Sequence, residues 1–180
     1  MKTIINNEFN LKDEDISEEI IRTKCIIIND NNQVLLGYCN NRFQFPGGQL
    51  KNNESLNECL YREIKEETGI ELEKTNYIPF KNVVYYVKNY HNLNKNIKNS
   101  IYYYLIRTNK QIDLNNINLD DKEIEGKYEI RVIPLDEVEK YLRSQKNDDI
   151  KGNSIINEMI DAFVECQRVI KEEENEINWN

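Results

Sequence analysis

The segment Gly48–Ile70 reads GQLKNNESLNECLYREIKEETGI and decides most of the fold prediction. Within it, Ser55–Glu58 has the pattern of a capping box, in which the first and last side chains satisfy backbone amides at the start of a helix. Apolar residues recur in this segment at helical spacing: Leu56, Cys59, Leu60 and Ile64. Gly69 stands where a helix commonly ends. The segment therefore predicts an amphipathic helix that starts after Ser55 and stops at Gly69.

Three carboxylates lie on one side of this predicted helix, because Glu63, Glu66 and Glu67 stand at positions i, i+3 and i+4. Like charges at this spacing repel, at a cost of roughly 0.2–0.5 kcal/mol for each exposed pair. A solvated helix rich in Glu and Lys is one interpretation, but it leaves this repulsion uncompensated. A bound cation compensates the repulsion, and ligands made only of oxygen favour a hard ion, Mg²⁺ or Mn²⁺, over zinc.

Two neighbouring features agree with a metal site. The pair Gly47-Gly48 lets the backbone approach a ligand closely, so the Gly47 carbonyl is a candidate oxygen ligand. Arg62 stands beside Glu63 and four residues before Glu66, so its guanidinium can orient a carboxylate through paired hydrogen bonds.

The whole segment resembles the Nudix box. That box has a glycine, a glutamate after five residues, and after seven more the run arginine, glutamate, aliphatic, any, glutamate, glutamate, any, glycine, aliphatic. Gly48, Glu54 and Arg62–Ile70 match every specified position, and Phe45–Gly48 looks like the usual lead-in of the family. The resemblance implies an α/β/α sandwich around a mixed β-sheet. It also implies hydrolysis of a nucleoside diphosphate linked to another group X.

By this resemblance, Glu63, Glu66 and Glu67 bind Mg²⁺ or Mn²⁺ together with the Gly47 carbonyl, and Arg62 orients a glutamate. A metal lowers the pKa of a bound water, a glutamate takes its proton, and a nucleoside phosphate leaves. A non-catalytic Nudix-like module that senses a nucleotide is the alternative, but such modules usually lose glutamates that this chain retains. A third hypothesis is that the chain is a relative with isomerase or mRNA-decapping activity on the same fold.

Further candidate residues lie outside the box. Nudix proteins often add a carboxylate before the last core strand, and Glu125 is our first choice there, with Glu129 second. Tyr86 is a candidate for stacking on a base, and Arg42 for meeting a phosphate, so both are predicted to bind substrate. The substrate itself stays open among modified nucleoside triphosphates, ADP-ribose-like sugars and dinucleoside polyphosphates, because fold does not determine specificity.

Strands and helices alternate in the rest of the chain, which predicts an α/β sandwich. Expected strands are Thr23–Ile28 and Gln33–Tyr38, which form a hairpin, then 43–45, 82–88, 100–107 and Glu129–Pro134. Residues 1–20 are polar and are expected to form an N-terminal arm. Residues 21–180 are expected to form one domain, which ends in a long amphipathic helix over 153–173.

The charge composition restricts the classes of molecule that the protein is expected to bind. The 180 residues carry a net charge of −8, which argues against nucleic-acid polymers and anionic membranes, since both attract basic surfaces. We expect a small nucleotide-type substrate instead, neutralised by the metal. The four cysteines lack CxxC spacing and suit a reduced, cytoplasmic protein. A monomer or a homodimer is expected.

Overall fold

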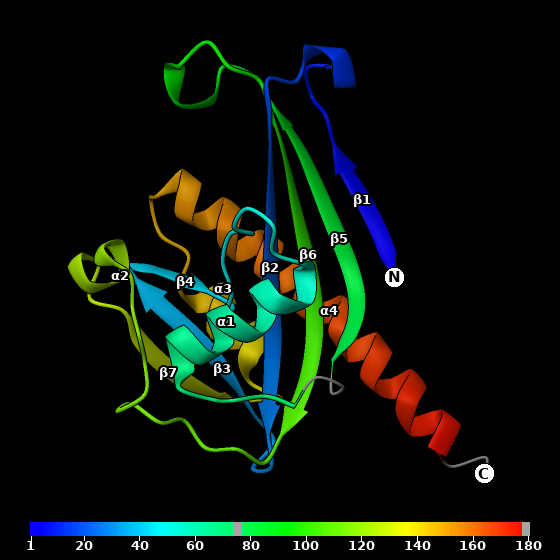
Figure 1. The fold of residues 1–180 in the computed structure, drawn as a ribbon. Coiled ribbons are helices and arrows are strands. Elements are labelled where there is room, and N and C mark those ends of the chain that lie inside the picture. Colours follow the sequence, from blue (N-terminus) through cyan, green and yellow to red (C-terminus); the bar gives the residue numbers. More distant parts are fainter. Residues whose placement is uncertain (74–76, 178–180) are drawn as a thin grey trace.

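The computed structural model describes residues 1–73 and 77–177. Its regular elements follow one another along the chain as shown in Figure 1. The strands are β1 (Lys2–Asn6), β2 (Glu18–Asn29), β3 (Gln33–Cys39), β4 (Arg42–Gln44), β5 (Ile78–Val87), β6 (Ile97–Thr108) and β7 (Glu129–Pro134). The α-helices are α1 (Leu56–Thr68), α2 (Asp121–Glu125), α3 (Val138–Ser144) and α4 (Ile150–Ile177), and two 3₁₀ turns cover Asp13–Asp15 and Tyr90–Asn92.

The strands form one mixed sheet in the order β1-β5-β6-β2-β3-β4, and β7 also pairs with β3. β2 and β6 run parallel over their full length, from Glu18 opposite Ile97 to Asn29 opposite Thr108. β2 and β3 form the predicted antiparallel hairpin, and β7 spans the predicted residues Glu129–Pro134. The mixed sheet is therefore confirmed.

Helices cover both faces of this sheet, α1 on one side and α4 on the other (Figure 1). Two apolar clusters fill the two layers. The cluster under α1 is made of Cys25, Ile27, Leu35, Leu60, Ile64, Ile70, Tyr104 and Ile106. The cluster under α4 is larger, and α4 contributes Ile156, Met159, Ile160, Phe163, Cys166 and Ile170 to it. The α/β/α sandwich is confirmed, and the apolar face of the last helix covers the core.

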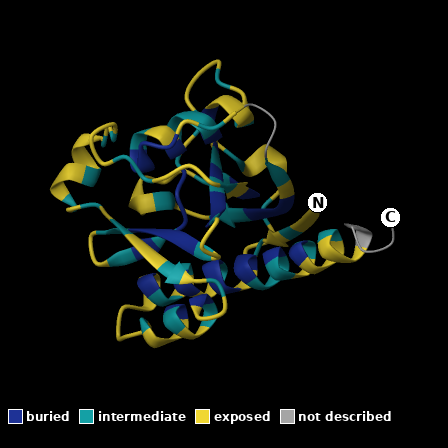
Figure 2. Cartoon of the chain, turned by 90° about the horizontal axis from the view of Figure 1, so that it is seen from below, coloured by how far each residue is buried: buried dark blue, intermediate teal, exposed yellow. Residues whose placement is uncertain are grey.

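Buried and exposed residues alternate along α4 (Figure 2), as its amphipathic sequence predicts. The helix begins at Ile150 and continues to Ile177, so it is longer than the expected 153–173. None of the helices within the described residues is both long and apolar enough to cross a membrane.

The N-terminal residues are not a free arm. Lys2–Asn6 forms β1, which adds to the edge of the sheet in parallel with β5, from Lys2 opposite Lys81 to Asn6 opposite Tyr85. Lys2 also forms an ion pair with Glu165 of α4, at 3.0 Å. The polar composition concealed this strand, because an edge strand of a half-buried sheet needs few apolar residues.

Candidate active site

The position of the glutamates follows from how α1 begins and packs. Ser55 caps the helix by accepting from the Glu58 amide, and the Glu58 side chain accepts from the Ser55 amide, as predicted. Gly69 ends the helix in the left-handed conformation, with φ of 70°. Leu60 and Ile64 are fully buried against the sheet, which fixes the rotation of α1. Glu63, Glu66 and Glu67 therefore lie along one edge of the helix.

The loop Pro46–Gln49 runs beside that edge and is tied to β2. Thr23 donates its amide to the Gly48 carbonyl at 3.0 Å, and Cys25 donates to the Pro46 carbonyl at 2.8 Å. Gly47 has φ of 129°, and a Cβ there would lie 2.2 Å from the Thr23 carbonyl oxygen. A Cβ on Gly48 would lie 2.3 Å from the Glu63 carboxylate. Two glycines are thus needed for the loop to lie this close to both neighbours.

Arg62 organises the outer part of the cluster. Its Nε and Nη2 donate to the two oxygens of Glu54, at 2.6 and 2.9 Å. Its Nη1 donates to Glu63 at 2.7 Å and to Glu66 at 2.9 Å. These hydrogen bonds lower the pKa of Glu54 to about 2 and raise the pKa of Arg62. One guanidinium therefore aligns three carboxylates.

Glu67 forms the inner part of the cluster and is only 1% exposed. Its Oε2 accepts from the Gly47 amide at 2.8 Å. Burial raises the pKa of Glu67 to about 8, although nearby Lys24 opposes that rise. The buried hydroxyl of Tyr128 lies close to Glu67: burial first, and then the Glu67 carboxylate, raise the pKa of Tyr128. The site thus places a costly buried carboxylate and a buried hydroxyl side by side.

Lys24 of β2 supplies the inner positive charge. Its ammonium donates to the Gly47 carbonyl and, at 3.2 Å, to Oε1 of Gln44. Burial lowers the pKa of Lys24, whereas the carboxylates of Glu67 and Glu63 raise it. Lys24 therefore lies where a cation can meet both the carbonyl and the carboxylates.

These groups open onto a cavity of about 900 Å³ between the glycine loop, β4, α2 and the start of α4. The acidic side chains along its wall are Glu63, Glu67, Asp120 and Glu123. The basic side chains along its wall are Arg22, Lys24, Arg42, Lys51 and Lys122. Five basic side chains thus gather around one cavity, although the net charge of the chain is −8. Together they can bind a polyanion.

Comparison with known families decides the classification. A family model described as NUDIX domain matches residues 20–152, which cover the sheet, the glutamate helix and the cavity. The chain belongs to the NUDIX domain family. As an enzyme it falls among the Nudix pyrophosphohydrolases. The box in Gly48–Ile70 is thus a true Nudix box.

The chain matches solved structures at low sequence identity. A MutT protein from Bacillus halodurans shares 22% identity at a TM-score of 0.48, over 67% of this chain and 72% of that one. A MutT structure from work on Aliivibrio salmonicida and Vibrio cholerae shares 21% identity at 0.47, over 77% and 96%. A MutT/nudix family protein from Enterococcus faecalis shares 19% identity at 0.45, over 63% and 42%.

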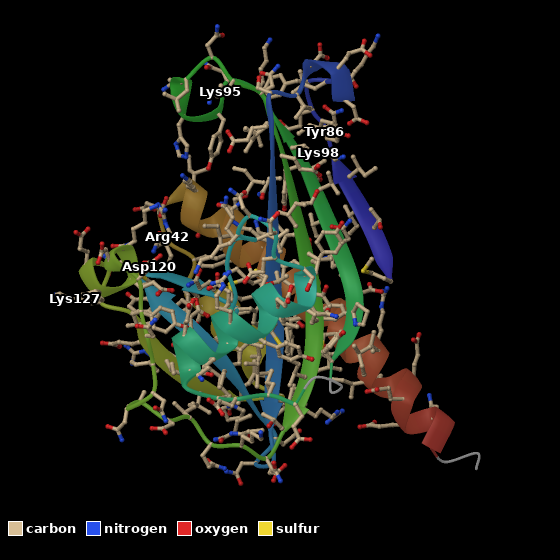
Figure 3. The ribbon with its side chains drawn as sticks, in the orientation of Figure 1. Arg42, Tyr86, Lys95, Lys98, Asp120 and Lys127 are labelled. Carbon is tan, nitrogen blue, oxygen red and sulfur yellow. The ribbon has the colours of Figure 1, made fainter. Side chains whose placement is uncertain are left out.

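The structure brings the box residues of this Nudix protein together with Arg42, but not with the other two candidates outside the box, Tyr86 and Glu125. Arg42 reaches the cavity wall, where its Nη2 pairs with Asp149 at 3.0 Å. Tyr86 lies far from Arg42 and Asp120 in Figure 3, near Lys98, and its hydroxyl donates to Asp13 at 2.7 Å. Tyr86 therefore does not line the cavity, and its predicted role in substrate binding is not supported.

The structure also leaves Glu125 outside the cavity wall. It is exposed at the end of α2 and is not among the described residues that line the cavity, whereas Glu123 is. Residues two apart on a helix point about 200° from each other, so one turn of α2 cannot aim both carboxylates at the site. The second choice, Glu129, is exposed on β7 and pairs with Arg131. Asp120-Asp121-Lys122-Glu123 has the capping-box pattern that could have revealed α2.

Sequence reasoning also missed Lys24, Gln44 and Tyr128. Lys24 did carry a signal, because it is a charged residue inside the apolar run Thr23–Ile28. Gln44 and Tyr128 carried none, since their closeness to Glu67 depends on the pairing of β4 and β7 with β3.

The box residues fit a divalent cation by their chemistry. Within the described part of the chain, no three Cys, His, Asp or Glu side chains already form a metal site. Glu63 and Glu66 are turned to Arg62, and Glu67 is turned to the Gly47 amide. The donor set is nevertheless all oxygen, and burial raises the pKa of Glu67, so a divalent cation that keeps this carboxylate ionised would stabilise the site.

Proposed function

We propose that this Nudix protein hydrolyses the phosphoanhydride bond of a nucleoside diphosphate linked to another group X, in a reaction that requires Mg²⁺ or Mn²⁺. The observation that carries the proposal is the carboxylate cluster of α1. Glu63 and Glu67 line a cavity beside Gly47 together with five basic side chains, and Arg62 links Glu63 to Glu66. Carboxylates there suit a hard cation, and the basic residues suit phosphates.

Glu63, Glu66, Glu67 and the Gly47 carbonyl would hold the metal. When bound, the metal supplies a water of lowered pKa and shields the phosphate charge. Arg62 keeps Glu63 and Glu66 oriented, because both accept from the same guanidinium nitrogen.

Glu67 is our choice for the proton acceptor. In the absence of a metal, burial raises the pKa of Glu67 to about 8, so its carboxylate is intrinsically more basic than that of an ordinary glutamate once a cation keeps it ionised. Its Oε2 is held by the Gly47 amide, which fixes the carboxylate toward the loop. The leaving group is a nucleoside phosphate.

Arg42 and the other basic residues of the wall would position the phosphates. Arg42 is presented from β4 and is paired with Asp149, which keeps its guanidinium at the rim. The Arg42 guanidinium can exchange that carboxylate for a phosphate, since either group offers two oxygens to its planar fork of N–H donors.

The test is a substrate panel with purified protein. Modified nucleoside triphosphates, ADP-ribose-like compounds and dinucleoside polyphosphates are each incubated with Mg²⁺, with Mn²⁺ and with EDTA, and products are separated by chromatography. We expect metal-dependent release of a nucleoside phosphate from one class, and loss of it in Glu67→Gln. Turnover that persists in EDTA would refute the metal requirement. No hydrolysis of any class, with nucleotide still bound, would favour the sensing module.

A further inference from the structure

Lys24 occupies a place that the proposed reaction assigns to a metal. Its ammonium donates to the Gly47 carbonyl, which is one of the proposed oxygen ligands, and to Gln44. The neighbouring carboxylates of Glu67 and Glu63 are the two acidic box residues that line the cavity. The ammonium of Lys24 thus already interacts with oxygens that are proposed to bind the metal ion.

The other cations near the box lie elsewhere. Arg62 is committed to Glu54, Glu63 and Glu66. Lys51 approaches the box only at Glu66, with its Nζ 3.9 Å from Oε1. Of these three cations, Lys24 is therefore the one whose ammonium contacts the Gly47 carbonyl.

The backbone of Lys24 cannot move away from the loop easily. The amides on either side of it, those of Thr23 and Cys25, donate to the carbonyls of Gly48 and Pro46 at 3.0 and 2.8 Å. β2 is also paired with β6 along its whole length. Only the side chain is left to rearrange, so the ammonium remains at high local concentration beside the site.

Burial makes this contact strong. Glu67 is 1% exposed, and a buried carboxylate needs a counter-charge or a proton. Two cations cannot share one carbonyl oxygen and one carboxylate in a half-buried site without strong repulsion. A metal ion that binds the Gly47 carbonyl must therefore push the ammonium off it.

We propose that Lys24 is a built-in counter-ion that a divalent metal displaces from the Gly47 carbonyl, so that Lys24 sets the metal affinity of the site. This inference rests on the metal-dependent function proposed above. It makes Lys24 a positioning residue: it holds the loop and Glu67 in place before the metal arrives, and it weakens metal binding in return.

The first measurement follows the ammonium itself in the wild-type protein. NMR of lysine side-chain ¹⁵N groups resolves hydrogen-bonded, buried ammonium signals, and Lys24→Met assigns the one from Lys24. Addition of Mg²⁺ is expected to shift or remove the Lys24 signal, while the backbone amide of the exposed Lys127 gives an internal reference. A Lys24 signal that stays unchanged while the Gly47 amide reports saturation by Mg²⁺ would overturn the proposal.

The second measurement is calorimetric titration with Mg²⁺. We expect Lys24→Met to bind Mg²⁺ at least about tenfold more tightly than wild type, since a hydrogen bond to a charged group is worth roughly this factor or more in an equilibrium constant. Lys122→Met is the matched control, because Lys122 lines the same cavity from α2 and not from the loop or helix of the box, and its affinity should stay within about twofold.

The two possible failures are distinguishable. Equal Mg²⁺ affinity in wild type and Lys24→Met would overturn the role of Lys24 and leave the proposed hydrolysis standing. Absence of Mg²⁺ binding in both proteins would overturn the metal assignment and the inference built on it. If Lys24→Met does not fold, the NMR titration of the wild-type protein still tests the displacement of Lys24. The Lys24 signal is then assigned with Lys24→Arg.

Discussion

Replacing Arg62 by methionine tests whether one guanidinium holds the glutamate cluster together. Hydrogen bonds from Arg62, and in smaller part from the Lys51 amide, lower the pKa of Glu54 from 4.5 to about 2. That difference corresponds to about 3 kcal/mol of interaction in the folded state. Solvent near the surface loop screens part of it, so we expect about 2 kcal/mol from the Arg62–Glu54 pair.

The assay is a double-mutant cycle by urea unfolding, with Arg62→Met, Glu54→Gln and both together. The coupling energy at pH 7 is expected to be about 2 kcal/mol. Arg143 and Glu139 provide the control pair, because they lie 2.7 Å apart on an exposed face of α3. Exposed pairs of this kind contribute about 0.5 kcal/mol or less.

The dependence on pH has a definite sign. A carboxyl whose pKa is lowered by folding stabilises the protein above its unfolded pKa of 4.5, and this stabilisation is lost as pH falls toward 2. The coupling should therefore fall to roughly half its value at pH 3. A coupling energy no larger than that of the Arg143–Glu139 pair at pH 7, or one that persists undiminished at pH 3, would refute the reasoning.

Three further predictions concern the same site. Glu67→Gln should reduce turnover by at least about a hundredfold, as loss of a general base does, while circular dichroism stays unchanged; full activity would remove Glu67 from the mechanism. In EDTA, the free energy of unfolding should fall as pH rises from about 4.5 to about 8, by at most about 1.4 kcal/mol per pH unit. The reason is that folded Glu67, with its pKa of about 8, keeps a proton that the unfolded chain has lost, and thermal melts of Glu67→Gln should lack this slope. Finally, Gly47→Ala should destabilise the fold by more than about 2 kcal/mol, because its Cβ meets the Thr23 backbone. Gly48→Ala meets only the movable end of Glu63, so melting should change little while turnover drops, and the reverse ranking would contradict the geometry.

The chemistry of the box could be predicted from the sequence because it is local. Glu63, Glu66 and Glu67 are brought together by the period of a single helix, and Ser55 and Gly69 mark where that helix starts and ends. Arg62 reaches Glu63 and Glu66 because it lies in the same turns of the helix. No long-range contact has to be known to expect a carboxylate cluster there.

Strand positions were also predictable, but their extent and pairing were not. The apolar runs located β2, β3 and β7, whereas the parallel pairing of β1 with β5 joins residues 2–6 to residues 81–85. Parallel strands far apart in the chain carry no local turn that announces their register. Tyr86 was misjudged for a related reason, because alternation along β5 determines which face a side chain takes only after the sheet is placed.

By itself, the sequence determined the helix, its caps, the carboxylate cluster and the Nudix box, because all of these depend on spacing within about one helix. Only the tertiary structure decided what surrounds Glu67. Lys24 reaches it from β2 and Tyr128 from the start of β7, and α2 turns Glu123 rather than Glu125 toward the cavity. These groups set the burial and the charge around Glu67, and burial and charge are properties of packed layers that no single stretch of sequence contains.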